Sequence, residues 1–149
     1  MLHVLEAIEG GTARHLVDLV RTAAGIEHHV AIPWRRVGGL TDTAAAGRMA
    51  AAGAVVHVVE MRRSPLRPRN LAALAGLAGL VRRVRPDVVH GHSSMGGALG
   101  RVAGTAARLP RVYTPNGLAQ GRAALGVERL LGPLTDRLVA TSASEADAS

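Results

Sequence analysis

Residues that could bind or transform a substrate gather in two short polar segments, and each segment follows an apolar run. The first is His90-Gly91-His92-Ser93-Ser94, which comes directly after two valines. The second is residues 113–117, Tyr-Thr-Pro-Asn-Gly, with Asn116 near its end. Histidine, serine and asparagine side chains exchange hydrogen bonds with hydroxyl and phosphate groups. These segments are therefore the first candidates for a ligand site.

A glycine pair, Gly10 and Gly11, follows the first apolar run and precedes a segment with helical periodicity. Backbone N–H groups at the N-terminus of a helix attract anions, and glycine lets a ligand approach closely. The spacing is not G-x-G-x-x-G, and no acidic residue ends the second predicted strand, so dinucleotide binding is disfavoured. A phosphate or sugar contact and a plain strand-to-helix turn both remain open at this position.

Histidine is a common metal ligand, but the spacing of the histidines does not bring together the three ligands that a metal site requires. His90 and His92 project to the same side if their strand persists. A zinc site needs a further histidine or carboxylate, and the adjacent residues His28 and His29 face two ways. We therefore predict no metal site. We expect one buried histidine and one, His92, at the mouth of the loop, where it can contact a substrate.

Four arginines, Arg62, Arg63, Arg67 and Arg69, lie in a proline-containing loop. Most runs of charge are simply solvated. The functional alternative is contact with a phosphate or an anionic lipid. Nucleic acid is disfavoured as a partner because aromatic residues, which stack on bases, make up only 1% of the chain.

The elements that must position these residues alternate between strand and helix. Apolar runs predict strands over residues 2–8, 26–32, 54–59, 88–91, 112–114 and 137–141. Helical periodicity and end signals predict helices over residues 12–24, 41–52, 70–85, 93–109 and 127–134. This alternation predicts an α/β fold: a Rossmann-like, doubly wound parallel sheet of about six strands with helices on both faces. Ligands bind such sheets beyond the carboxyl ends of the strands, where both polar segments fall.

The helix after the histidines is predicted in more detail. Ser93 or Ser94 is expected to cap its N-terminus, and Pro110 to end it. Its predicted buried face consists of Ala98, Leu99, Val102, Ala106 and Leu109.

Composition sets further limits. The chain has 149 residues, enough for one domain with a core, and it is 48% hydrophobic. It contains no cysteine, which excludes disulfides and thiolate metal sites. Its formal net charge of +7 favours anionic partners. Neither a signal peptide nor a membrane span is evident, so we expect a cytoplasmic domain, with peripheral contact at the inner face of the plasma membrane.

The sequence resembles the N-terminal domain of a GT-B-fold, family 4-type glycosyltransferase. The resemblance runs almost from end to end, and the order and spacing of its motifs make it specific. The sequence around His92 and Tyr113 is most similar to that of enzymes that build exopolysaccharides on lipid-linked acceptors. The motifs that carry it are the glycine pair with residues 12–19, residues 85–94, 97–101 and 112–117, and residues 134–142.

The resemblance implies a retaining sugar transfer that uses no metal or other cofactor. The substrates would be a nucleotide sugar, UDP- or GDP-linked, and a glycan or lipid-linked acceptor. Gly10 and Gly11 would receive the donor diphosphate, and Asn116 and His92 would be the catalytic residues. Ser93, Ser94, Arg67 and Arg69 would bind the acceptor.

Two departures from the family pattern bear on activity. The family usually has histidine where this chain has Asn116, and an asparagine can hydrogen-bond a hydroxyl but cannot carry a proton. It often has lysine where this chain has Met95.

We expect residues 1–149 to form a single acceptor-side domain, without the C-terminal donor-binding domain. We expect that domain in a longer enzyme or a separate subunit, with the isolated chain inactive, rather than a degenerate relic. A non-catalytic, Rossmann-like module that binds a nucleotide or phosphate is the alternative function.

Overall fold

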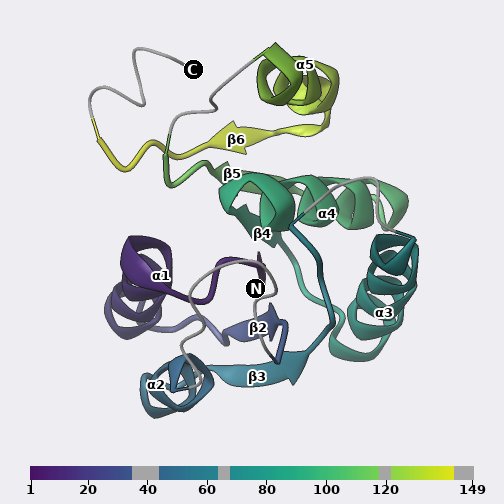
Figure 1. The fold of residues 1–149 in the computed structure, drawn as a ribbon. Helices are drawn as coiled ribbons and strands as arrows, with labels where there is room; N and C mark the ends of the chain where they lie inside the picture. The colour runs from purple at the N-terminus through teal and green to yellow at the C-terminus, as the bar shows by residue number, and fades with distance from the viewer. Residues whose placement is uncertain (35–43, 64–67, 118–121, 143–149) are drawn as a thin grey trace.

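The computed structural model describes residues 1–34, 44–63, 68–117 and 122–142. Within these ranges, six parallel strands form a sheet in the order β3-β2-β1-β4-β5-β6 (Figure 1). The strands are β1 (Leu2–Leu5), β2 (His29–Ile32), β3 (Val55–Val58), β4 (Val89–His92), β5 (Arg111–Thr114) and β6 (Arg137–Leu138). The predicted Rossmann-like parallel sheet is confirmed.

Helices cover both faces of the sheet, as predicted. The α-helices are α1 (Gly10–Thr22), α2 (Ala45–Ala51), α3 (Arg69–Val84), α4 (Ser93–Ala106) and α5 (Arg122–Leu131), and a 3-10 turn, η1 (Gly132–Leu134), follows α5. One apolar core joins α1 and α2 to the sheet, and a second joins α3 and α4 to its opposite face (Figure 1). In the described ranges, none of the helices combines the length and hydrophobicity that crossing a membrane requires.

Alternation along β1 decides which side chains face which core. Leu2 and Val4 belong to the core under α3 and α4, whereas Leu5 belongs to the core under α1. Because side chains two apart in a strand share a face, His3 lies on the α1 side with Leu5. The pairing of β1 with β4 sets His3 opposite His90, and this register brings together histidines that are far apart in the sequence.

The predicted buried face of α4 is confirmed at Leu99, which is buried, and at Leu109, which packs against the core, but it is wrong elsewhere. Val102 and Ala106 are exposed, and the helix buries Met95 and Ala103 as well as Leu99, with a stripe of glycines. A Cβ built on Gly96 would lie 2.5 Å from the Val4 carbonyl oxygen. The glycines therefore face the sheet because only they let the helix backbone approach it so closely.

The predicted serine cap of α4 is also wrong. The residue before the helix is His92, in extended conformation, and it makes no side-chain capping hydrogen bond. Ser93 is itself the first helical residue and has a φ of 55°. A left-handed backbone at a non-glycine residue is unfavourable, and such strain concentrates at functional sites.

Several boundaries differ from the predictions. β1 ends at Leu5, before the predicted residue 8, and α1 begins at Gly10 rather than Thr12. The last helix begins earlier than predicted, and Pro133 lies in the 3-10 turn that ends it. The predicted start of the second helix lies outside the described residues.

A buried arginine joins α5 to α4 and β5. Arg101 is 1% exposed, and its Nη2 donates to the Glu128 carboxylate at 2.9 Å. Its guanidinium also lies 4.0 Å from the centre of the Tyr113 ring. The Tyr113 hydroxyl donates to the other oxygen of Glu128 at 2.9 Å, so the three side chains form a closed cluster.

Candidate functional site

Three segments that are distant in sequence meet at the carboxyl edge of the sheet, where parallel α/β sheets bind ligands. They are the start of α1, the turn after β5, and the residues that follow β6. Together they enclose a cleft of about 580 Å³. Its lining residues are Gly11, Thr12, His15, Asp18, Asn116, Val139, Ala140 and Thr141. Two residues predicted from separate motifs, Gly11 and Asn116, thus line one cleft.

The start of α1 is open to an approaching ligand. Gly10 has a φ of 64°, which suits glycine, and Glu9 makes no side-chain capping hydrogen bond. No heavy atom lies within 4 Å of a Cβ built on either Gly10 or Gly11. The start of the helix is therefore unobstructed at both glycines, which leaves room for an anion to approach the helix N-terminus.

Asn116 is held in a strained backbone conformation next to two histidines. Its φ is 55°, a region that asparagine tolerates better than most residues. Its side-chain amide donates to His15 Nδ1 at 2.9 Å. Its Oδ1 is buried without a hydrogen-bond partner, and its side chain also interacts with His92. His15 is a site residue that sequence reasoning missed; its position one turn after Thr12 on α1 was the available signal.

A chain of buried imidazoles runs inward from Asn116. His92 Nε2 lies 3.1 Å from His3 Nδ1, and His3 Nε2 lies 2.9 Å from His28 Nδ1. His28 Nε2 faces the Ala23 carbonyl oxygen at 3.4 Å. His92 is 0% exposed, so the expectation that it stands at the mouth of the loop is wrong. It lies beneath Asn116 instead, because the strand continues through His92 and turns that side chain under α1.

Burial keeps His3, His90 and His92 uncharged at neutral pH. Desolvation, with smaller contributions from neighbouring histidines, holds the pKa of His3 and of His92 well below the usual range. The same causes lower the pKa of His90 to about 4. Neutral imidazoles have the lone pairs that hydrogen bonding and metal ligation use.

The structure brings three histidines close enough together to hold a metal ion, although the sequence pattern predicts no metal site. His3, His90 and His92 each offer a ring nitrogen, and these atoms lie within 4.8 Å of one another. The third ligand, His3, escaped sequence reasoning because only the register of β1 against β4 places it beside His90. A histidine at an alternate position of the first strand was the signal.

We expect acid to destabilise the fold through these buried histidines. Unfolded histidines ionise near pH 6.5, whereas His90 stays neutral in the folded chain down to a pKa of about 4. The unfolded state thus binds more protons in this window. Stability is greatest above about pH 6.5 and falls by up to about 1.4 kcal/mol per pH unit for each such imidazole. Urea unfolding across this window, in buffer with a chelator, measures the slope. A His90→Gln variant should make the slope shallower, because His3 and His92 still contribute, and a flat wild-type profile would contradict the assignment.

The residues predicted to bind an acceptor are divided between two places. Ser93 and Ser94 begin α4 at the carboxyl edge, with Ser94 exposed. Arg69 begins α3 and is exposed, and Arg67 lies outside the described residues. Arg69 lines a second cleft, of about 690 Å³, between β3 and α3.

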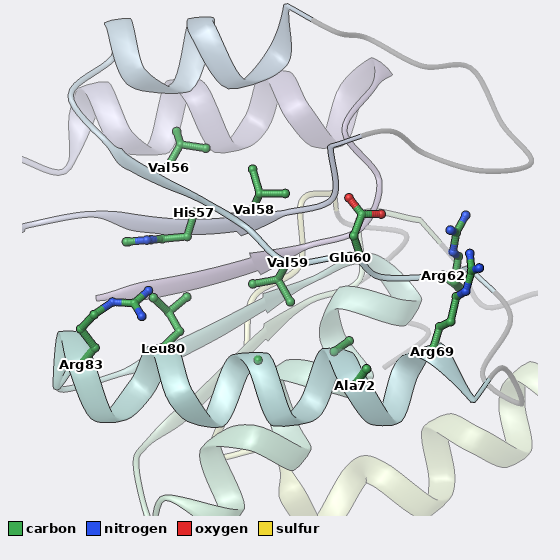
Figure 2. Close-up of a pocket in the computed structure, with 12 residues that line it drawn as sticks. Val56, His57, Val58, Val59, Glu60, Arg62, Arg69, Ala72, Leu80 and Arg83 are labelled. Atoms are coloured by element: carbon green, nitrogen blue, oxygen red, sulfur yellow. The ribbon is translucent and has the colours of Figure 1, made fainter.

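Positive side chains stand at both ends of this second cleft. Figure 2 shows Arg62 and Arg69 at one end and Arg83 at the other, with Val59 and Leu80 between them. Among the lining residues that the structure describes, Glu60 is the one acidic residue. An apolar floor between cations suits a molecule that combines an apolar part with an anionic group.

The fold and the cleft define the chain as a Rossmann-like domain of the type that binds ligands beyond its strand ends. The family model described as Glycosyltransferase Family 4 matches residues 9–149, and the chain belongs to that family. This confirms the resemblance drawn from the sequence motifs.

Solved structures support the same fold. HepE from Anabaena, in complex with UDP and glucose, aligns with a TM-score of 0.76 at 17% identity, covering 99% of this chain and 39% of HepE. The UDP-GlcNAc 2-epimerase from Methanocaldococcus jannaschii aligns with a TM-score of 0.62 at 11% identity, covering 99% of this chain and 40% of the epimerase. The chain therefore spans about two fifths of each of these proteins. A comparison with curated protein sequences finds no match.

Proposed function

We propose that this chain is the acceptor-side, N-terminal domain of a retaining GT-B glycosyltransferase that uses a nucleotide sugar, acting in cell-surface or exopolysaccharide synthesis. The observation that carries the proposal is the cleft that unites Gly11, His15 and Asn116 at the carboxyl edge of the sheet in a Family 4 chain. HepE is solved with UDP and glucose, which supports a UDP-sugar rather than a GDP-sugar as the donor. A C-terminal domain, on the same or another chain, completes the donor site.

In this proposal the donor diphosphate lies over the start of α1. The space around Gly10 and Gly11 is open there, and neither glycine presents a side chain that would keep an anion from the amide groups of the helix start. His15, one turn along the helix, lines the same cleft. Asp18 lines it further from the glycines and suits sugar hydroxyls rather than a phosphate, which its carboxylate repels.

Asn116 holds the donor sugar and does not transfer a proton. An amide has no titratable proton, so it supplies hydrogen bonds alone. Its Oδ1 has no partner in the cleft and is turned toward His92, while its nitrogen is engaged by His15. His92 is buried beneath it and acts as a positioning residue, not as a group that touches the substrate. The transfer itself is proposed to proceed without a metal ion.

The acceptor is proposed to bind on the same edge of the sheet, near Ser93 and Ser94. Its anionic part, such as the phosphate of a lipid-linked glycan, would contact Arg69, and Arg67 remains a prediction. The second cleft supports this assignment, because Arg62, Arg69 and Arg83 flank its apolar floor. Such an acceptor would place the protein at the cytoplasmic face of the membrane.

Titration of the ¹⁵N-labelled chain with UDP, GDP and UDP-glucose tests the donor role. We expect weak, millimolar binding, because the contacts from the donor domain are missing, with shifts centred on the amides of Gly10, Gly11, His15 and Asn116. Tight binding would instead favour the alternative function, a module that holds a complete nucleotide site. Shifts confined to other parts of the chain would remove the donor role from the start of α1.

Loss of the Asn116 side chain is expected to slow sugar transfer. When the chain is assayed with a donor domain, Asn116→Ala should lower kcat/KM by about 10- to 100-fold, equivalent to about 1.4–2.7 kcal/mol of lost hydrogen bonding. Asp87→Asn, on the exposed turn before β4 at the opposite edge of the sheet, is the matched control and should keep the wild-type rate. Full activity in Asn116→Ala would exclude the proposed contact with the donor sugar.

A further inference from the structure

We propose that His3, His90 and His92 form a binding site for one divalent metal ion of the zinc class. Each offers a ring nitrogen within 4.8 Å of the others, and all three are buried. Two imidazoles bound to one zinc ion at 2.0–2.1 Å place their nitrogens about 3.3 Å apart in a tetrahedron. His3 Nδ1 and His92 Nε2, 3.1 Å apart, already stand near that separation.

The number of N–H protons available to the row of imidazole rings supports the presence of a cation between His3 and His92. The chain of three rings, His92–His3–His28, ends against an oxygen at each side: the Asn116 amide and the Ala23 carbonyl. Two contacts between rings and two contacts to oxygen need four N–H protons, but three neutral imidazoles carry only three. With the Asn116 amide placed as it is, its nitrogen on His15 and its oxygen toward His92, one contact in this row goes unsatisfied. The two facing atoms at that end, His92 Nδ1 and Asn116 Oδ1, are both buried without a partner.

A metal ion in place of the contact between His3 and His92 removes this deficit. Both nitrogens would then present lone pairs to the metal. His3 Nε2 could donate to His28, His28 Nε2 to the Ala23 carbonyl, and His92 Nδ1 to Asn116. Every ring nitrogen in the chain would be satisfied with all three imidazoles neutral, the form that binds metal.

His90, the third ligand, also has a polar partner for the ring nitrogen that would not bind the metal. His90 Nε2 lies 2.8 Å from Thr114 Oγ1, which leaves Nδ1 for a metal. Ligand histidines in metal sites generally donate their other N–H to a nearby polar group, which fixes the tautomer and the ring orientation. Here His28, Thr114 and Asn116 fill that role for His3, His90 and His92 respectively.

The ligand set decides the class of metal and its role. Three imidazoles without a carboxylate suit Zn²⁺, Co²⁺ or Ni²⁺ and do not suit Mg²⁺ or Ca²⁺, which require oxygen ligands. His3 and His92 are 0% exposed, so the ion would join β1 to β4 rather than touch a nucleotide in the cleft. This inference does not rest on the proposed sugar transfer, and a structural ion is compatible with a transfer step that uses none.

Reconstitution with cobalt tests the site. The full chain is unfolded in a chelator, freed of metal and refolded with Co²⁺, because the buried ligands are best loaded as the sheet assembles. We expect one Co²⁺ per chain, the intense visible absorption of a tetrahedral site, displacement by Zn²⁺, and a Tm increase of about 8 °C at a 100-fold excess over Kd. X-ray absorption of the zinc form should count three imidazole ligands.

Variants separate this site from the other pair of neighbouring imidazoles. His29 Nδ1 and His57 Nε2 lie 3.0 Å apart on β2 and β3. His57→Gln should therefore keep the cobalt spectrum, whereas His3→Gln and His90→Gln should lose it while retaining native circular dichroism. The proposal would be overturned if only the His57→Gln variant lost the spectrum, if the spectrum were octahedral, or if the X-ray absorption data of the wild type counted fewer than three imidazoles. The last measurement decides the question even if a variant fails to fold.

Discussion

Gly96→Ala is expected to destabilise the fold of the chain strongly. The new Cβ would lie 2.5 Å from the Val4 carbonyl oxygen and 3.1 Å from the Glu6 nitrogen, and both atoms belong to the backbone. No side-chain rotation can relieve this overlap, so α4 must move away from β1. We expect a loss of about 3 kcal/mol or more, a large part of the roughly 5–15 kcal/mol that stabilises a native domain. Urea unfolding followed by circular dichroism measures it.

Gly79→Ala on α3 is the matched control. It introduces the same methyl group in a helix, but no heavy atom lies within 4 Å of the new position. Because alanine has a higher helix propensity than glycine, this variant should be more stable by about 0.5–1 kcal/mol. If Gly96→Ala unfolded at the same urea concentration as Gly79→Ala, the close packing of α4 against the sheet would be contradicted.

The packing of α4 also shows where sequence reasoning fails. Periodicity located the helix after the histidines, yet it assigned the buried face to Val102 and Ala106, which are exposed. A hydrophobic pattern counts apolar side chains, and it gives no weight to a glycine whose function is to bring two backbones together. Gly96 and Gly100 pack in this way, and only the distance between helix and sheet reveals it.

In the candidate site, too, some residues could be predicted from the sequence and others could not. The rule that parallel strands end at one edge was enough to predict that Gly11 and Asn116 would lie near one another. The rule carries no information about register, and register decides that His3 stands opposite His90. The sequence predicts His92 at the mouth of a loop, but sequence patterns locate strand ends only to within a residue or two. One further residue of strand is enough to bury this side chain.

Glu128→Ala is expected to destabilise the chain by about 2–4 kcal/mol, because it removes the partner of a buried cation. Arg101 is 1% exposed, so its charge cannot recover full hydration when the carboxylate is lost. The Tyr113 hydroxyl loses its acceptor at the same time. Because the Glu128 side chain is 25% exposed, we expect a smaller loss of stability than for a fully buried ion pair. Chemical denaturation, with the m-value checked for two-state behaviour, gives the difference.

Comparison with a more exposed ion pair, between β5 and the residue before β6, separates burial from charge pairing. Arg111 and Asp136 also form a close ion pair, at 2.7 Å, but the two side chains are 20% and 45% exposed. Water can replace the lost partner there, so Asp136→Asn should cost clearly less than Glu128→Ala. Arg101→Met should likewise cost less, since it leaves only a partly solvated carboxylate, and adding Arg101→Met to Glu128→Ala should restore stability. If the double variant were less stable than Glu128→Ala alone, desolvation of the arginine would not be the cause, and packing of its side chain against Tyr113 would explain the loss instead.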